Sequence, residues 1–285
     1  MEKYINDFKQ MVEIRNLTEN TVKTYSGYLR EFLAYADANL SKDASQVTWE
    51  EIRGYILYLK NARGLNPRSI NPHIAQLRFF FLYVLHKQWD HYQVPSLKFD
   101  SYLPFVLSQE KARHFIDTLE NLKHKAIISL MYSAGLRVSE ACNLKYSDIS
   151  RKNMTIYIKR SKNRSDRYAI LSENALAILT EYWVAYRKPK GWLFPSTHAN
   201  GRPIVAFTVH RFIKGHEKRL GWESRISCHT WRHNFGTHLY ENGADLLAIK
   251  NAMGHKSLNS TVLYLHLGGY KQRAVCSPFD KKALT

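Results

Sequence analysis

SCHTWRHNFGTHLYENGADLLAIKNAMGHKSLNSTVLYLHL, residues 227–267, holds the side chains on which the fold and chemistry of this chain depend. His229 and Arg232 are three residues apart and share one face of a predicted helix. A Gly-His pair ending at His255 closes the next helical segment, and Tyr264 follows nine residues later in an aliphatic run. We hypothesise that these groups converge on one phosphodiester, with Tyr264 as the nucleophile.

The composition indicates a two-domain globular protein with a polyanionic partner. Its 285 residues are 45% hydrophobic and 23% charged, which is ordinary for a folded chain of this length. The formal net charge is +18, and residues 101–285 carry +16 of it, with 29 Lys and Arg against 13 Asp and Glu. A charge this large and uneven favours a polyanion, although a solvated basic surface has the same composition.

Membrane, secreted and nucleotide-hydrolysing proteins are disfavoured by what the sequence lacks. It has no run of eighteen apolar residues and no basic segment leading into an apolar one at its start, so neither a membrane span nor a signal peptide is expected. No basic amphipathic helix points to a membrane surface. Three scattered cysteines predict no disulfide framework, which fits a cytoplasmic location. No glycine-rich phosphate loop supports nucleotide hydrolysis.

Residues 1–93 predict an all-helical N-terminal domain. Apolar side chains recur at helical spacing in four segments, which begin near residues 1, 18, 48 and 67. Thr18 is a plausible N-cap, Thr48 opens a capping box, and Pro67 suits the first turn of the fourth helix. Residues 94–104, VPSLKFDSYLP, break all periodicity between two prolines and predict an interdomain linker.

Residues 105–285 predict a second domain that is mainly helical with a small antiparallel β-sheet. Helices are expected over residues 109–119, 123–134, 137–144, 173–187 and 206–220. A strand over residues 154–160, a polar turn over 161–166 and a returning strand over 167–171 form a hairpin. The expected fold class is therefore mainly α, with one small sheet in the second domain.

Two arginines lie in apolar stretches, Arg137 in ISLMYSAGLRVSEACNL and Arg232 in WRHNFGTHLY. Such an arginine is either ion-paired in the core or part of a site. A phosphodiester under attack gains negative charge, and guanidinium groups that bind two oxygens at once stabilise it well. Glu140, three residues after Arg137, is placed to orient that arginine. The spacing by itself leaves both interpretations open.

A general acid and a nucleophile are needed beside the arginines. The departing alkoxide of a phosphodiester needs a proton, and Lys162 in the hairpin turn is a candidate donor, although that turn holds many solvated basic residues. Tyr264 is the candidate nucleophile, but a phenol of ordinary pKa is only about 0.1% ionised at pH 7, so cations or a base must assist it. An ordinary packing role is the alternative for each of three residues, Tyr264, His229 and His255. Only their occurrence together with the arginines favours a site.

A zinc site is the competing interpretation of the same helix. His229 and His233 are spaced i, i+4, as metal ligands on a helix are. The zincin pattern requires a glutamate directly after the first histidine, where Thr230 stands, and a third ligand would have to come from elsewhere in the chain. The sequence therefore disfavours a zinc site here.

The ordered motifs resemble the tyrosine recombinases of the phage integrase family, in particular Xer-like and integron-integrase-like members. They are Arg137 in AGLRVSE, Lys162 in a hairpin, HTWR followed by HNFGTHL, Gly-His, and Tyr264 in TVLYLHL. The resemblance covers essentially the whole chain. It implies a two-domain DNA clamp, with a helical, SAM-like core-binding domain at residues 1–93 and a catalytic domain at residues 105–285.

The resemblance also implies how the phosphate would be held. Arg137 and Arg232 would bind the non-bridging oxygens of the scissile phosphate. Glu140 matches the acidic residue that supports the first arginine in this family, and His255 would donate a hydrogen bond to the phosphate. The four side chains come from three separate motifs, so the implied site depends on the fold bringing them together.

The covalent step implied by the resemblance is a 3′-phosphotyrosyl bond to Tyr264. Lys162 would protonate the 5′-hydroxyl leaving group and His229 would serve in acid–base chemistry. The phosphotyrosyl bond conserves the energy for rejoining, so no cofactor is implied. The expected partner is double-stranded DNA with specific recombination sites, bound by a homotetramer that passes through a Holliday junction, with an accessory directionality protein and a cytoplasmic, nucleoid-associated location.

Two other functions remain open at this stage. A type IB topoisomerase-like enzyme uses the same chemistry to relax DNA instead of exchanging strands. A sequence-specific DNA-binding protein without catalysis would share the basic charge, although every catalytic position of the recombinase pattern is present here. Assembly on paired sites would separate the first alternative from a recombinase, and covalent attachment to DNA would separate the second.

Overall fold

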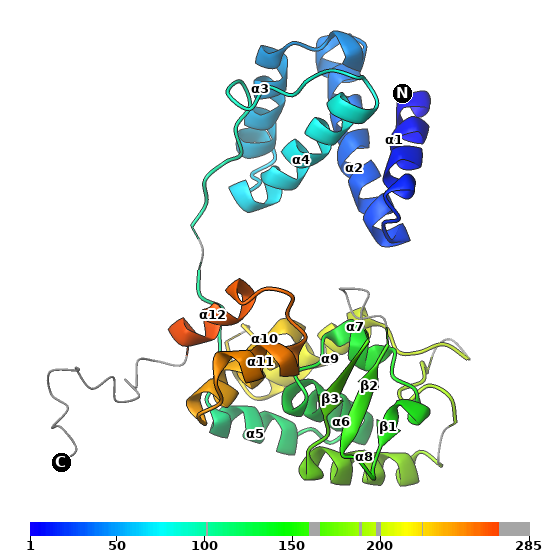
Figure 1. The fold of residues 1–285 in the computed structure, drawn as a ribbon, viewed down its shortest axis with the longest axis vertical. Helices are drawn as coiled ribbons and strands as arrows, with labels where there is room; N and C mark the ends of the chain where they lie inside the picture. Colours follow the sequence, from blue (N-terminus) through cyan, green and yellow to red (C-terminus); the bar gives the residue numbers. More distant parts are fainter. Residues whose placement is uncertain (101, 160–165, 188–189, 198–200, 224, 268–285) are drawn as a thin grey trace, which may run out of the picture. The chain divides into compact units, whose positions relative to one another are not determined.

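The computed structural model describes residues 1–100, 102–159, 166–187, 190–197, 201–223 and 225–267. The chain divides into two compact units, residues 1–101 and 102–285, each with its own hydrophobic core (Figure 1). Leu97, in the predicted linker, belongs to the first unit, because its backbone N–H and C=O both bond the side-chain amide of Asn71. None of the described helices is both long and apolar enough to cross a bilayer.

The first unit is a bundle of four α-helices. These are α1 (Glu2–Ile14), α2 (Glu19–Tyr35), α3 (Trp49–Leu57) and α4 (Pro67–Tyr83). Short π-helical turns extend α2 over Ala36–Leu40 and α3 over Tyr58–Ala62, and a 3-10 turn spans Ala44–Gln46. The predicted helical content of this unit is confirmed.

Side-chain caps begin two of these helices where the sequence predicts. The Thr18 hydroxyl accepts a hydrogen bond from the Thr21 N–H at the start of α2. At α3 the capping box is complete, since Thr48 and Glu51 each accept from the other's backbone N–H. Each such cap satisfies backbone groups that the helix itself leaves unpaired.

The second unit surrounds a larger core with helices and one sheet. Its first five helices are α5 (Gln109–Asp117), α6 (Leu122–Ser133), α7 (Val138–Cys142), α8 (Glu173–Ala185) and α9 (Ala206–Arg219). All five match predicted segments, with α7 shorter than the expected 137–144 because Asn143 leaves helical geometry. α6 is almost wholly buried between α8 and α10, and it forms the centre of the unit.

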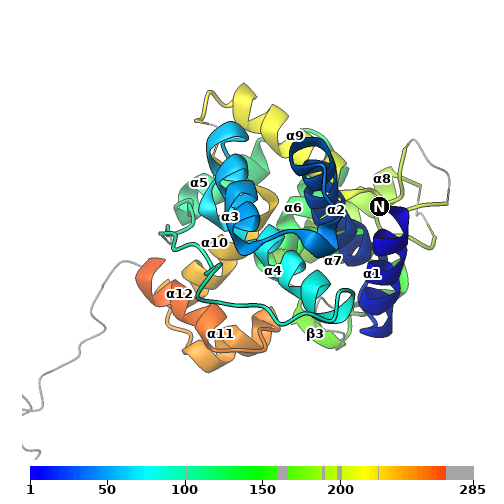
Figure 2. The same ribbon diagram turned by 90° about the horizontal axis from the view of Figure 1, so that it is seen from above.

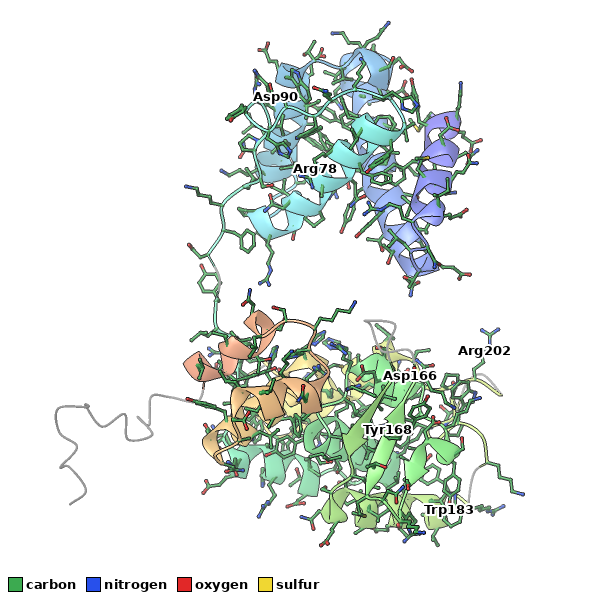
Figure 3. All side chains as sticks on the ribbon, in the orientation of Figure 1. Arg78, Asp90, Asp166, Tyr168, Trp183 and Arg202 are labelled. Carbon is green, nitrogen blue, oxygen red and sulfur yellow. The ribbon has the colours of Figure 1, made fainter. Side chains whose placement is uncertain are left out.

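The sheet has three antiparallel strands in the order β1 (Ile149–Ser150), β2 (Thr155–Ile158) and β3 (Arg167–Ile170). Ile158 pairs with Arg167 at the turn end of the β2–β3 hairpin, and residues 161–165 of the predicted turn, with Lys162, lie outside the described residues. β2 and β3 confirm the predicted hairpin. β1 was not predicted, because two residues are too short to show a period. Tyr168 extends from the exposed face of β3 (Figure 3).

Residues 227–267 fold into three helices, α10 (Cys228–Glu241), α11 (Leu246–Met253) and α12 (Asn259–Leu267). α11 and α12 pack against α10 and against each other (Figures 1 and 2). Their contact is a separate small core of buried residues, namely Phe235, Ile249, Met253 and Tyr264. Tyr264 therefore lies where α12 meets α10.

Candidate active site

Arg137 is presented by a sharp turn between α6 and α7. Gly135 has φ +60°, and a Cβ atom there would lie 2.3 Å from Phe235, so only glycine fits. Arg137 is the N-cap residue of α7, and its Nη1 donates to Glu140 Oε1 at 2.8 Å. Its backbone N–H donates to the other oxygen of Glu140 at 2.9 Å. The predicted support of Arg137 by Glu140 is thus present in the geometry.

Arg232 joins three segments from the buried face of α10. Its side chain is 6% exposed, and its two Nη atoms donate to the backbone carbonyls of Gly135 and Met253. Burial, together with neighbouring Arg137, lowers the pKa of Arg232 to about 10, while Glu140 acts in the opposite direction. At pH 7 the guanidinium therefore remains charged.

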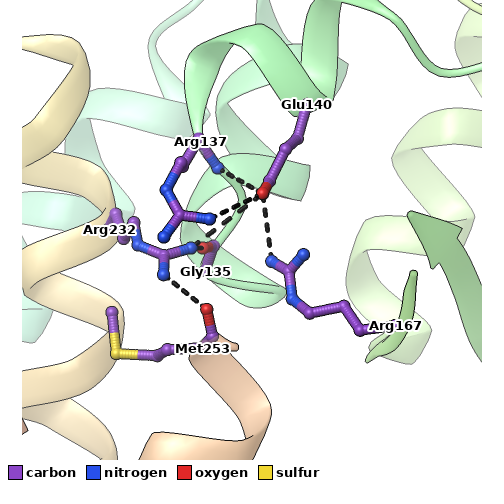
Figure 4. Close-up of polar contacts among 6 residues, drawn as sticks. All are labelled: Gly135, Arg137, Glu140, Arg167, Arg232 and Met253. Carbon is purple, nitrogen blue, oxygen red and sulfur yellow. Dashed lines mark hydrogen bonds and ion pairs between the residues drawn. The ribbon is translucent and has the colours of Figure 1, made fainter. Parts of the chain in front are cut away.

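Glu140 accepts from two arginines and lies close to a third (Figure 4). Arg167 Nη2 donates to Glu140 Oε2 at 3.0 Å, and Arg232 Nη1 lies 3.9 Å from the same oxygen. Burial acts to raise the pKa of Glu140, but Arg167 and Arg137 outweigh it and hold that pKa below its ordinary value. One carboxylate among three guanidinium groups leaves a net positive charge of about two, which suits an anion.

Tyr264 packs on α10 directly beside this cationic cluster. Its side chain is almost fully buried, with the ring lying over Gly236. Burial raises the pKa of Tyr264 to about 12, although Arg232 and Arg137 act to lower it. The phenol is therefore un-ionised at neutral pH, so a nucleophilic role requires transfer of its proton as attack occurs.

His255 stands between the end of α11 and the start of α12. Gly254 ends α11 with φ +63°, and His255 Nδ1 lies 2.9 Å from Thr261 Oγ1. Its ring is stacked near Tyr264, with centroids 6.3 Å apart and planes 9° from parallel. Burial, with Arg232 and Arg137 nearby, lowers the pKa of His255 to about 4. The imidazole is neutral at pH 7 and still has one N–H to donate.

His229 is exposed in the first turn of α10, farther from Tyr264 than His233 is along the same helix face. The His229 and His233 rings are 6.4 Å apart, and the His233 ring is 6.2 Å from Tyr264. Burial and His229 lower the pKa of His233 to about 4. In the described part of the chain, no cluster of three or more potential metal ligands includes this pair.

The structure brings four of the predicted residues together with Glu140, namely Arg137, Arg232, His255 and Tyr264. His229 lies beside His233, one helical turn before it, and Lys162 lies outside the described part. Sequence reasoning missed Arg167 and His233. Arg167 was the first residue of the predicted returning strand, and the hairpin pattern was the only signal in the sequence that could have pointed to it. His233 was weighed only as a zinc ligand, although its i, i+4 spacing from His229 already placed both on the Arg232 helix.

Gly236 is expected to be intolerant of even one methyl group. A Cβ there would lie 2.6–2.8 Å from three atoms of the Tyr264 ring, so Gly236→Ala forces the ring away from α10. We expect a loss of about 1–3 kcal/mol in the free energy of unfolding, measured by chemical denaturation. Gly215→Ala on α9 is the matched control, because its Cβ would meet nothing within 4 Å, and it is expected to gain about 0.5–1 kcal/mol. A Gly236→Ala protein as stable as the control would contradict the packing described.

Known proteins similar in fold include DNA-bound recombinases. The chain resembles a XerH site-specific recombinase bound to palindromic difH substrate, with a TM-score of 0.72 and 22% identity over 94% of this chain and 82% of that one. It also resembles the Tn1549 transposon integrase in complex with circular intermediate DNA, with a TM-score of 0.73 and 20% identity over 92% and 94%. At these identities the likeness concerns the fold alone.

Sequence relatives and family models cover nearly the whole chain. A putative integrase/recombinase, y4qK, of Sinorhizobium fredii (strain NBRC 101917 / NGR234) is 39% identical over 94% of this chain and 86% of its own length. The tyrosine recombinase XerD of Listeria monocytogenes (strain EGD-e) is 30% identical over 99% and 100%. Residues 4–91 match the phage integrase N-terminal SAM-like domain, and residues 106–269 match the phage integrase family. The chain belongs to the phage integrase family of tyrosine recombinases.

Proposed function

We propose that this protein is a site-specific DNA recombinase that cleaves and rejoins strands through a 3′-phosphotyrosyl bond to Tyr264. The observation that carries the proposal is the placement of Tyr264 beside Arg137 and Arg232, the two guanidinium groups that share Glu140. A buried cationic cluster next to a phenol, in a member of this family, supports attack on a bound phosphodiester.

In the proposed step the Tyr264 oxygen attacks phosphorus as the bond to the 5′-oxygen breaks. Arg137 and Arg232 hold the non-bridging oxygens, where negative charge builds, and neutral His255 donates a hydrogen bond. Lys162 gives its proton to the departing 5′-oxygen, and His229 takes part in moving the proton of the phenol. Reversal by another 5′-hydroxyl restores a phosphodiester and the free tyrosine, so the number of high-energy bonds is unchanged.

DNA is the proposed partner of both units. Residues 1–93 would form the core-binding half and residues 105–285 the catalytic half of a clamp, joined by residues 94–104. The net charge of +16 in residues 101–285 supports strong attraction of the second unit to phosphates. The solved relatives bound to difH substrate and to circular intermediate DNA support the same assignment.

The proposed assembly is a homotetramer on two recombination sites, with exchange through a Holliday junction. One active site cleaves one strand, so two duplexes with four strands require four protomers. An accessory protein would set the direction, and the enzyme would act at the nucleoid. Topoisomerase-like relaxation stays the rival with the same chemistry, and a two-site assay distinguishes them, since only a recombinase joins strands from different sites.

A nicked suicide substrate tests the proposal. A binding site is first selected from a random duplex pool with the full-length protein, and a nick is then placed so that the cleaved fragment diffuses away and rejoining is blocked. We expect a protein–DNA adduct that resists detergent, forms in EDTA, and maps by mass spectrometry to Tyr264. Absence of any adduct, or an adduct on another residue, would overturn the proposal. Strand exchange between two labelled sites then separates recombination from relaxation.

A further inference from the structure

Arg167 is a buried arginine at the first position of β3, outside the predicted set of site residues. Its side chain is only 10% exposed, and Nη2 donates to Glu140 Oε2 at 3.0 Å. Arg167 pairs with Ile158 across the hairpin, so its backbone is held by the sheet. The chain thus directs a third guanidinium group onto the carboxylate that Arg137 already uses (Figure 4).

The other side of the Arg167 side chain covers Gly254. A Cβ atom on Gly254 would lie 2.6 Å from Arg167 Cδ and 2.7 Å from Nε. Gly254 also has φ +63°, so this position needs glycine both for its backbone and for the close approach of Arg167. Since Gly254 directly precedes His255, one side chain contacts both the support of Arg137 and the turn that presents His255.

Arg167 retains donors that structural pairing alone would not leave unused. Its Nε and Nη1 are buried and have no hydrogen-bond partner among the residues described. Buried unpaired donors are rare and unfavourable in proteins, so these two call for an explanation. Because both atoms are buried, they are not accessible to a bound DNA strand, and we expect Arg167 to act on neighbouring protein groups.

We propose that Arg167 is a positioning residue of the phosphate site: it holds Glu140 against Arg137 and packs on Gly254, so that Arg137 and His255 converge on one phosphodiester. This rests on the proposed function of the site. Arg167 acts through Glu140 and Gly254 and has no direct contact with the DNA. Without Arg167, Glu140 keeps its hydrogen bond to Arg137 but loses the one that connects it to β3. The turn at Gly254 also loses the side chain that packs on it.

Arg167→Met tests the proposal, because methionine is long and flexible but has neither charge nor donors. We expect the single-turnover rate of adduct formation to fall by about 10- to 100-fold, the usual effect of losing a partner that orients a site residue. The Kd for DNA should change by less than about threefold, because no phosphate contact is removed. Arg151→Met, at an exposed arginine after β1, is the matched control and should change neither quantity appreciably.

A double-mutant cycle shows whether Arg167 acts through Arg137. If it does, Arg167→Met slows an Arg137→Ala background by a smaller factor than it slows the wild type, because one of the two groups that it positions is already gone. Arg167→Lys should recover part of the rate, since an ammonium group can still pair with Glu140. Rate losses that multiply in the double variant, or equal losses in binding and cleavage in Arg167→Met, would overturn the proposal.

Gly254→Ala disturbs the same contact while leaving the arginine in place. Its Cβ would displace the Arg167 side chain, whereas Gly221→Ala, at φ +67°, meets nothing within 4 Å and serves as a control for the backbone strain. We expect Gly254→Ala to lower the adduct-formation rate by about tenfold or more relative to Gly221→Ala. Equal rates in the two variants would show that covering Gly254 has no part in the site.

A measurement on the protein without DNA keeps this inference separate from the proposed reaction. The NMR resonances of the His255 imidazole are followed through a pH titration in the wild type and in Arg167→Met. We expect altered His255 shifts and a raised His255 pKa, because one of the nearby positive charges is removed. Unchanged His255 resonances would overturn the positioning role. A wild type that forms no DNA adduct would instead overturn the recombinase proposal, and this titration would still judge Arg167.

Discussion

Tyr264→Phe is expected to abolish the covalent DNA adduct, with a loss on the order of 10⁴-fold or more in single-turnover cleavage. The reason is that phenylalanine has no oxygen to form the phosphotyrosyl bond, and loss of a nucleophile commonly removes nearly all of the rate. The measurement is the adduct yield on the nicked substrate, separated on a denaturing gel. An adduct of normal yield in Tyr264→Phe would show that another residue is the nucleophile.

The same substitution should leave folding and DNA binding intact. The Tyr264 ring lies over Gly236 in the small core with Phe235, and phenylalanine keeps this packing. Tyr240→Phe, on the α10 side of the same core, is the matched control and should form the adduct at the wild-type rate. If the denaturation midpoint fell strongly in Tyr264→Phe but not in Tyr240→Phe, the packing argument would be contradicted. Loss of the adduct could then result from unfolding and not from loss of the nucleophile.

Arg232→Met is expected to give the second largest effect, because it removes a proposed phosphate ligand and also the donor to two backbone carbonyls. Removing one preorganised donor to a developing charge costs about 10²–10³-fold in rate, and a guanidinium group provides more than one donor. We therefore expect cleavage to fall by about 10³-fold or more in the single-turnover assay. The free energy of unfolding should also fall, since the carbonyls of Gly135 and Met253 lose their donor at about 1–3 kcal/mol each.

Arg232→Lys separates charge from geometry at this position. The ammonium group retains the positive charge, but a single nitrogen cannot bond two carbonyls on different segments and also bind two phosphate oxygens. We expect the lysine variant to recover less than about a tenth of the wild-type cleavage rate. Arg211→Met, at an exposed arginine on α9, controls for the loss of one positive charge and should retain wild-type stability. Near-normal cleavage by Arg232→Lys would show that charge alone is sufficient there.

Local rules in the sequence were enough to predict the helices and to nominate the candidate site residues. Thr18, Thr48 and Ser108 begin helices because their hydroxyls satisfy backbone N–H groups within three residues, and such pairs are visible in sequence. The order Arg137, Lys162, His229-x-x-Arg232, His255 and Tyr264 indicated the family before any packing was known. The two-residue strand β1 was missed because it is too short to show a period, and its pairing with β2 depends on the fold.

The partners of the site residues were decided only by tertiary structure. Arg232 bonds Gly135, 97 residues away, and Arg167 reaches Glu140 across 27 residues, and no local period or cap predicts either contact. The need for glycine at position 236 arises from the ring of Tyr264, which packs there only when α12 lies on α10. The sequence by itself determined the helices, the basic charge and the ordered set of reactive side chains, because these follow from local spacing. The packing of α10, α11 and α12 beside α7 and β3 decided which of these charges share one carboxylate, because burial and distance exist only in the folded chain.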